Sequence, residues 1–238
     1  MPDERFLKWY SPALNREMEL LVYGEGGSPV IVCPTSGARF YEWKDFKMVE
    51  ALAPKIDAGH IQLYCVDSVS LQSWYNDHIH PRERVLIHNR WEAYLKDELI
   101  PLIHSANPNR FIITAGTSFG AFLAVNFALK HPELVGKAVG ISGSYSIRRL
   151  LDGYYDEDCY FNDPVSYVEN MNDDLLALIR RMQIMLVTSD HDIGICRERT
   201  FDLSRVLDEK GIFHTLHDWG GNTGHDWPYW RTMIGHYL

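Results

Sequence analysis

Short apolar runs alternate with segments of helical periodicity along most of this chain. The runs are bounded by glycine, proline or small polar residues, which is typical of buried strands. We expect strands at Val30–Cys33, His60–Val66, Ile112–Gly116, Lys137–Ser142, Gln183–Thr188 and Gly211–Trp219. Apolar residues at helical spacing predict helices directly after Gly120 and at Phe46–Ile56, Arg82–Ile103, Gly194–Glu209 and Tyr229–Leu238. This order predicts an α/β fold with a mostly parallel central sheet and helices on both faces.

The strand that begins at Ile112 runs into a Gly-x-Ser-x-Gly motif, Gly116–Gly120, and a helical pattern follows at once. A serine on such a turn is exposed above the sheet, and glycines flank it where side chains would collide with the backbone. The N–H groups of the following helix can hold negative charge that develops on an attacked carbonyl. The motif therefore predicts that Ser118 is a nucleophile, although the same residues can form a plain tight turn.

An acid and a base follow Ser118 in the order that this arrangement requires, acid before histidine. Asp190 and Asp192 come directly after the strand at Gln183–Thr188, and His225 follows a glycine-rich loop, Gly220–Gly224, after the last strand. All three would lie at the carboxyl edge of the sheet, where open α/β sheets place their chemistry. Either carboxylate could instead cap the helix that follows, so the pattern alone leaves the choice of acid open.

One region, residues 143–181, lacks any convincing strand and contains an aromatic and acidic stretch at 152–161. An insertion here would be a small cap over the active site or a solvated surface excursion, and both readings remain open. The chain shows no internal repeat, low-complexity tract or linker. We therefore expect residues 1–238 to form a single domain, with 143–181 as its candidate cap.

Composition narrows the class of protein. The chain has 238 residues, is 46% hydrophobic and carries a formal net charge of −9, which argues against a nucleic-acid partner. No apolar stretch reaches transmembrane length, and the N-terminus lacks the pattern of a secretion signal. Four scattered cysteines favour free thiols in a reducing compartment. We expect a cytoplasmic protein without a membrane partner. The oligomeric state is open and includes a homo-oligomer. The scattered cysteines are Cys33, Cys65, Cys159 and Cys196.

The motifs together resemble the α/β-hydrolase superfamily, and within it the esterase branch that contains S-formylglutathione hydrolase (esterase D), the mycolyltransferases and the feruloyl esterases. The resemblance rests on Gly116–Gly120, on the acid turn Ser189–Asp192 and on Gly224-His225-Asp226-Trp227. That branch usually has Gly-His-Ser-Met-Gly-Gly, whereas this chain has Thr117, Phe119 and Ala121. The resemblance implies a serine esterase that needs no cofactor and acts on small-molecule carboxylic esters, with small or medium acyl groups, aromatic ones included.

Residue roles follow from this resemblance. Ser118 is the expected nucleophile and His225 the base, and Asp192 is preferred over Asp190 because Ser189-x-x-Asp192 matches the superfamily's acid turn. An oxyanion hole needs one N–H from the residue after the nucleophile, Phe119, and one from the loop Pro34–Gly37. Pro34 has no N–H, so Ser36 is the expected second donor, with Gly37 next.

Aromatic side chains near this edge are candidates for the substrate pocket, although large aromatics commonly pack under loops. Trp74 and Tyr75 follow a strand of the catalytic edge, and Trp227 follows the histidine, so these three are the expected substrate-binding residues. His78 and His80 form a His-x-His pair beside Asp77, but a metal site needs a third convergent ligand, and we expect no metal.

Two other functions use the same fold. An acyltransferase would use the same triad and an alcohol in place of water. A non-catalytic binding protein would keep the fold alone, but such proteins usually lose a triad member, and this chain keeps all three. Ester hydrolysis is therefore the expected activity.

Overall fold

A computed structural model describes residues 2–172 and 174–238. Its centre is an eight-stranded sheet in the order β1-β2-β4-β3-β5-β6-β7-β8. The strands β3 to β8 run parallel to their neighbours, and an antiparallel hairpin of β1 and β2 adds to the edge at β4. The strands are β1 (Glu4–Ser11), β2 (Arg16–Tyr23), β3 (Ser28–Cys33), β4 (Ile61–Val66), β5 (Ile112–Thr117), β6 (Val135–Ile141), β7 (Gln183–His191) and β8 (Thr215–Gly224).

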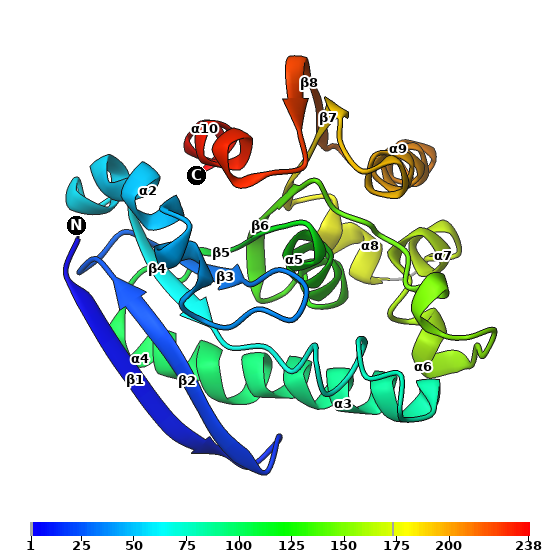
Figure 1. The fold of residues 1–238 in the computed structure, drawn as a ribbon, viewed down its shortest axis with the longest axis horizontal. Coiled ribbons are helices and arrows are strands. Elements are labelled where there is room, and N and C mark those ends of the chain that lie inside the picture. The colour runs from blue at the N-terminus through cyan, green and yellow to red at the C-terminus, as the bar shows by residue number, and fades with distance from the viewer. Residues whose placement is uncertain (1, 173) are drawn as a thin grey trace.

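Helices cover both faces of the sheet (Figure 1), as the alternation of elements predicts. On one face lie α1 (Glu42–Asp45), α2 (Met48–Asp57) and α10 (Trp227–Tyr237). On the other lie α3 (Pro81–Tyr94), a π-helical turn η1 (Leu95–Leu99), α4 (Ile100–Ala106), α5 (Phe119–Lys130) and α9 (Gly194–Glu209). No helix among the described residues is both long and apolar enough to cross a membrane.

The central strands are mostly apolar because both of their faces are buried; Gln62 in β4 and Thr114 in β5 are buried polar exceptions. In β3, Ile31 and Cys33 point into the core on the α5 side, whereas Val30 and Val32 point into the core on the α2 side. Successive strand side chains face opposite sides of a sheet, so a continuous apolar run suits a strand between two helical layers. Burial between two helical layers thus holds in place the parallel strands at whose carboxyl ends the site lies.

Two predicted boundaries differ in the structure. The single helix expected at Arg82–Ile103 is divided by the wider turn η1 just before Pro101, which has no N–H to continue the α-helical bonding. The glycine-rich loop expected at Gly220–Gly224 is instead the end of β8. It pairs with β7 through a register shift, and Gly221 and Asn222 have φ of 73° and 65° there. In this segment the glycines therefore form a bulge within a strand and not a loop.

The segment 143–181 is helical where it is regular. It contains η2 (Arg148–Leu150), α6 (Glu157–Tyr160), α7 (Pro164–Glu169) and α8 (Asp174–Ile179), while Asp173 lies outside the described residues. Figure 1 places α6 near the end of α3, and α7 below α9. The segment thus packs on the layer formed by α3, α5 and α9. Its role as a cap over the active site stays a prediction.

Candidate active site

Ser118 occupies a sharp turn between β5 and α5, as the motif predicts. Its backbone has φ 53° and ψ −124°, a conformation that costs free energy and is typical of a strained functional turn. A Cβ atom on Gly116 would lie 2.1 Å from the Gly120 carbonyl oxygen, and one on Gly120 would lie 2.3 Å from the Cys33 carbonyl oxygen. Only glycine fits at either position, because in both cases the obstacle is backbone that cannot rotate away.

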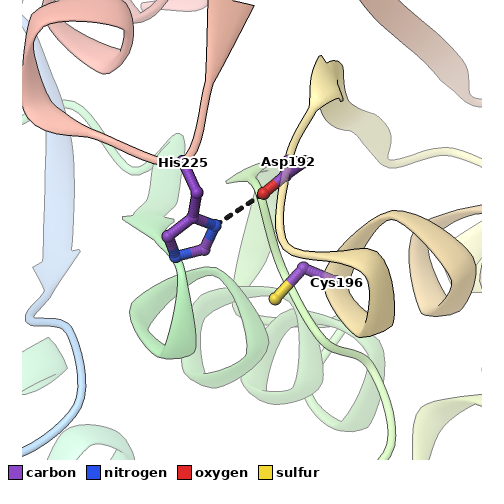
Figure 2. A group of neighbouring side chains, drawn as sticks. All are labelled: Asp192, Cys196 and His225. Carbon is purple, nitrogen blue, oxygen red and sulfur yellow. Dashed lines mark hydrogen bonds and ion pairs between the residues drawn. The ribbon is translucent and has the colours of Figure 1, made fainter.

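Three side chains from three strand ends meet above this turn. The Ser118 Oγ lies 2.9 Å from His225 Nε2, and His225 Nδ1 lies 2.6 Å from Asp192 Oδ1. A carboxylate only accepts hydrogen bonds, so Nδ1 carries the proton and Nε2 is free to accept one from the serine hydroxyl. Figure 2 shows the imidazole directed at the carboxylate. The arrangement can therefore take a proton from Ser118 and stabilise the charge that results on His225.

Asp192 is held firmly in this position. Its side chain is fully buried, Thr188 Oγ1 donates to its Oδ2 at 3.0 Å, and the Ile193 N–H donates to its Oδ1 at 2.9 Å. Asp190 lies elsewhere: it is exposed, and its Oδ2 accepts a hydrogen bond from the Asn222 N–H at 3.3 Å. Of the two acids, the one that contacts the imidazole is Asp192.

The loop after β3 presents a limited set of free donors. The Thr35 N–H donates to Glu42 Oε2 at 2.8 Å, and the Thr35 hydroxyl bonds to the same carboxyl group. Pro34 has no N–H. The next donor along the loop is Ser36, and on the opposite side Phe119 is the first residue of α5, where an N–H has no partner within the helix. Phe119 directly follows Ser118, and the roles of Phe119 and Ser36 as oxyanion donors stay predictions.

Of the three aromatic residues expected to bind substrate, two lie beside the site. The Tyr75 ring packs edge-on against Phe119 with centroids 5.0 Å apart, and its hydroxyl lies 2.6 Å from the Ser36 Oγ. The Trp227 ring stacks on Phe46 with centroids 4.4 Å apart and is half-buried next to the histidine loop. Their role in substrate binding stays a prediction.

Trp74 is a correction to that expectation. Its side chain is 1% exposed and lies in the core against Phe122 and His88, so it does not line an accessible pocket. Trp74 and Tyr75 are neighbours in sequence, but the Trp74 ring is buried, whereas the half-buried Tyr75 side chain reaches the Ser36 hydroxyl. A position after a catalytic-edge strand does not tell which of two adjacent side chains faces outward.

Three further residues near the triad are not among the site residues assigned from the sequence. The Trp230 ring packs edge-on against the His225 imidazole with centroids 4.9 Å apart. Arg149, from the segment 143–181, lies beside the Tyr75 hydroxyl: burial raises the pKa of Tyr75, while Ser36 and the Arg149 guanidinium oppose the rise. Cys196 lies on the first turn of α9. The signals that the sequence offers are the position of Cys196 four residues after Asp192 and, for Trp230, the aromatic spacing of α10.

Asp192, Cys196 and His225 offer a carboxylate, a thiol and an imidazole whose ligand atoms lie within 4.8 Å of one another (Figure 2). A thiol binds metal as the thiolate, and burial raises the pKa of Cys196 to about 12. The imidazole Nδ1–H is already bonded to the carboxylate. These donors therefore suit a metal poorly and are explained by the hydrogen-bonded pair with a neutral thiol beside it. His78 and His80, the other pair considered, lie on an exposed loop.

Comparison with known proteins gives one family and a consistent set of structures. The family model described as "Putative esterase" matches residues 11–235. A ferulic acid esterase superposes with a TM-score of 0.77 at 15% identity, over 99% of this chain and 96% of that chain. An S-formylglutathione hydrolase from Agrobacterium tumefaciens gives 0.76 at 16% identity, over 99% and 92%. The enzyme of that name from Staphylococcus aureus gives 0.72 at 14%, over 99% and 95%. No curated protein is similar in sequence.

Proposed function

Since this chain belongs to the esterase family whose model spans residues 11–235 and is a serine hydrolase, we propose that Ser118, His225 and Asp192 are its catalytic triad and that it hydrolyses carboxylic esters. It has the α/β-hydrolase fold of its structural neighbours. The observation that carries the proposal is the hydrogen-bond chain from the Ser118 hydroxyl through both nitrogens of His225 to Asp192.

The reaction follows from this chain of bonds. The Ser118 Oγ attacks the ester carbonyl carbon as His225 Nε2 removes the hydroxyl proton. The imidazolium that forms keeps its Nδ1–H on the Asp192 carboxylate, which stabilises the new charge. The carbonyl oxygen becomes an oxyanion and accepts hydrogen bonds from the N–H groups of Phe119 and Ser36. When the intermediate collapses, the leaving alcohol takes the proton from Nε2, and the acyl group stays on Ser118.

Hydrolysis of this acyl-enzyme repeats the same steps with water. His225 removes a proton from the water, whose oxygen attacks the acyl carbon, and the proton then returns to the Ser118 oxygen as the carboxylic acid leaves. Both halves use one base, and both oxyanions form at the same donors. A small or medium acyl group fits beside the Tyr75 ring and the half-buried Trp227 ring, which are the aromatic surfaces that border the site.

The test is a comparison of Ser118→Ala with Ser105→Ala, a serine on α4 far along the chain from any strand end of the site. Ser118→Ala is expected to lower kcat on p-nitrophenyl acetate by about 10⁴- to 10⁶-fold and to abolish labelling by a fluorophosphonate. Ser105→Ala should retain both. Stoichiometric labelling of Ser118→Ala would refute the assignment. Products measured with an added alcohol would separate hydrolysis from acyl transfer.

A further inference from the structure

The segment 143–181 brings a positive charge to the edge of the site. Arg149 lies in the turn η2 after β6, and its guanidinium is close enough to the Tyr75 hydroxyl to affect that group's ionisation. The same hydroxyl bonds to the Ser36 side chain, and the Tyr75 ring contacts Phe119. Arg149 thus lies next to the residues that we place around the reacting carbonyl oxygen.

Arg149 also lines a cavity of about 140 Å³. The other lining residues are Ser146, Arg148, Asp163, Val165, Ser166, Ile195 and Arg199. One lining residue, Ile195, adjoins Cys196 in the sequence, and the Cys196 sulfur lies within 4.8 Å of ligand atoms of Asp192 and His225. This volume is several times the ~10–15 Å³ that a cavity needs to hold one water molecule. The cavity therefore has room for a small polar group of a bound molecule.

The arginines of this cavity differ in their partners. Arg148 pairs with the buried carboxylate of Asp163 at 3.1 Å, and Arg199 pairs with Asp202 and with Glu198. Within residues 2–172 and 174–238, Arg149 has no carboxylate at ion-pair distance. An exposed guanidinium that pairs with no carboxylate of the described residues is available to an anion from outside.

We propose that Arg149 binds a carboxylate of the ester substrate, so that the enzyme prefers esters bearing a negative charge close to the scissile bond. The guanidinium fork matches a carboxylate in a bidentate manner and stays charged at every physiological pH. Tyr75 lies beside this guanidinium. The charges of Arg148 and Arg199, which line the same cavity, are opposed by their own carboxylate partners, so Arg149 is the cation left for a substrate carboxylate. This inference rests on the proposed ester hydrolysis and specifies its substrate class.

The experiment uses two matched pairs of aryl esters. In the first, the monoaryl ester of adipic acid is compared with its methyl-capped diester, which places the charge on the acyl side. In the second, 4-acetoxybenzoate is compared with its methyl ester, which places the charge on the alcohol side. For the wild type we expect a higher kcat/KM for the charged member of one pair, and the pair that shows it identifies the side.

Arg149→Gln is expected to lower kcat/KM for that charged ester by about 10- to 100-fold, the range of a charge-assisted hydrogen bond, and to leave the neutral ester nearly unchanged. Arg149→Lys should retain part of the preference, and added salt should weaken it. The matched control is Arg205→Gln on α9, which removes the same charge from an exposed i,i+4 pair with Glu209. Arg205→Gln should leave the charged-to-neutral ratio of kcat/KM unchanged in both ester pairs.

The two levels of the proposal fail in different ways. If the wild type hydrolyses neither neutral ester, the proposed ester hydrolysis is wrong. If it hydrolyses the neutral esters but Arg149→Gln leaves both charged-to-neutral ratios unchanged, the carboxylate site at Arg149 is wrong and ester hydrolysis stands. If Arg149→Gln lowers kcat/KM equally for charged and neutral esters at an unchanged Tm, the carboxylate site at Arg149 is also wrong.

Discussion

At the scale of single residues, side-chain direction separates the assignments that the sequence supports from those it leaves open. Ser118 and His225 could be proposed from motif and chain order, because a strained turn and a position after the last strand leave signatures in sequence. Asp192 could be distinguished from Asp190 by resemblance only. In the structure, one is buried against the imidazole and the other is exposed. The Trp74 expectation was wrong because a position after a strand does not show whether a side chain is buried, and Trp74 is 1% exposed.

The acid assignment can be tested by comparing two amides. Asp192→Asn keeps the shape of the side chain but offers an N–H where His225 Nδ1 needs an acceptor, so it favours the wrong imidazole tautomer. The equivalent change in a well-studied serine protease triad costs about 10⁴-fold, and we expect a loss of that order in kcat/KM. Asp190→Asn should change kcat/KM by less than about threefold, because this exposed side chain makes one long hydrogen bond.

Melting temperatures of both variants accompany the kinetics, so that a loss of fold is not taken for a loss of chemistry. A severe kinetic effect of Asp190→Asn beside a near-normal Asp192→Asn would reverse the assignment. Mild effects in both would place the acid outside this turn.

At the scale of elements, strands were the easier part of the prediction. Parallel strands buried on both faces are mostly apolar, so their existence is visible in the sequence. Interruptions within helices and strands were harder to predict. The turn η1 before Pro101 and the bulge in β8 depend on which backbone hydrogen bonds the neighbouring residues and strands can form. The turn η2 with Arg149 had no periodic signal at all. The position of the Arg149 guanidinium beside Tyr75 was therefore not predictable from the sequence.

The turn between β5 and α5 can be tested through its glycines. Gly120→Ala would place a Cβ 2.3 Å from the Cys33 carbonyl oxygen, so α5 must move away from β3 and carry Ser118 with it. A misplacement on the order of 1 Å costs about 100-fold in rate, and we expect at least that loss in kcat/KM together with a lower Tm.

The matched control is Gly235→Ala in α10, where nothing lies within 4 Å of the added Cβ. Alanine is the better helix former by about 1 kcal/mol, so this variant should be fully active and slightly more stable. Normal activity of Gly120→Ala would show that the close approach of α5 to β3 is not needed.

At the scale of the whole molecule, a buried polar network joins the segment 143–181 to the rest. Glu92 on α3 bonds to Lys130 on α5, and Asn126 Nδ2 donates to both Glu92 and Asn162, 3.1 Å from each acceptor. Burial alone would raise the pKa of Glu92. The positive charge of Lys130 and the hydrogen bond with His88 outweigh this effect and lower the pKa to about 2. The network thus depends on an ionised carboxylate far from water.

Stability should therefore depend on pH through Glu92. Its pKa is about 2 in the folded state, below the ordinary value of 4.5, so its contribution is complete above about pH 4.5 and is lost as the pH falls through about 2. Urea unfolding at a series of pH values should show this loss in the wild type, and Glu92→Gln should remove this part of the slope. An unchanged slope in Glu92→Gln would contradict the assignment.

Removing the cation tests the same network at neutral pH. Lys130→Met leaves the buried carboxylate without its main partner and is expected to cost about 3–5 kcal/mol of unfolding free energy. The matched control, Lys96→Met, breaks an exposed pair with Asp97 and should have little effect. Similar unfolding free energies for the two variants would show that the buried ion pair carries no special weight.

The sheet order has a consequence for the way in which activity is lost. Ser118 follows a central strand, but His225 follows β8, which pairs with β7 alone and is bulged at Gly221 and Asn222. Edge segments open with less free energy than central ones, without global unfolding. Transient fraying of β8 withdraws the base while the nucleophile stays in place, so the catalytically competent population should be smaller than the folded one. Amide hydrogen exchange, faster in β8 than in β5, would report that difference.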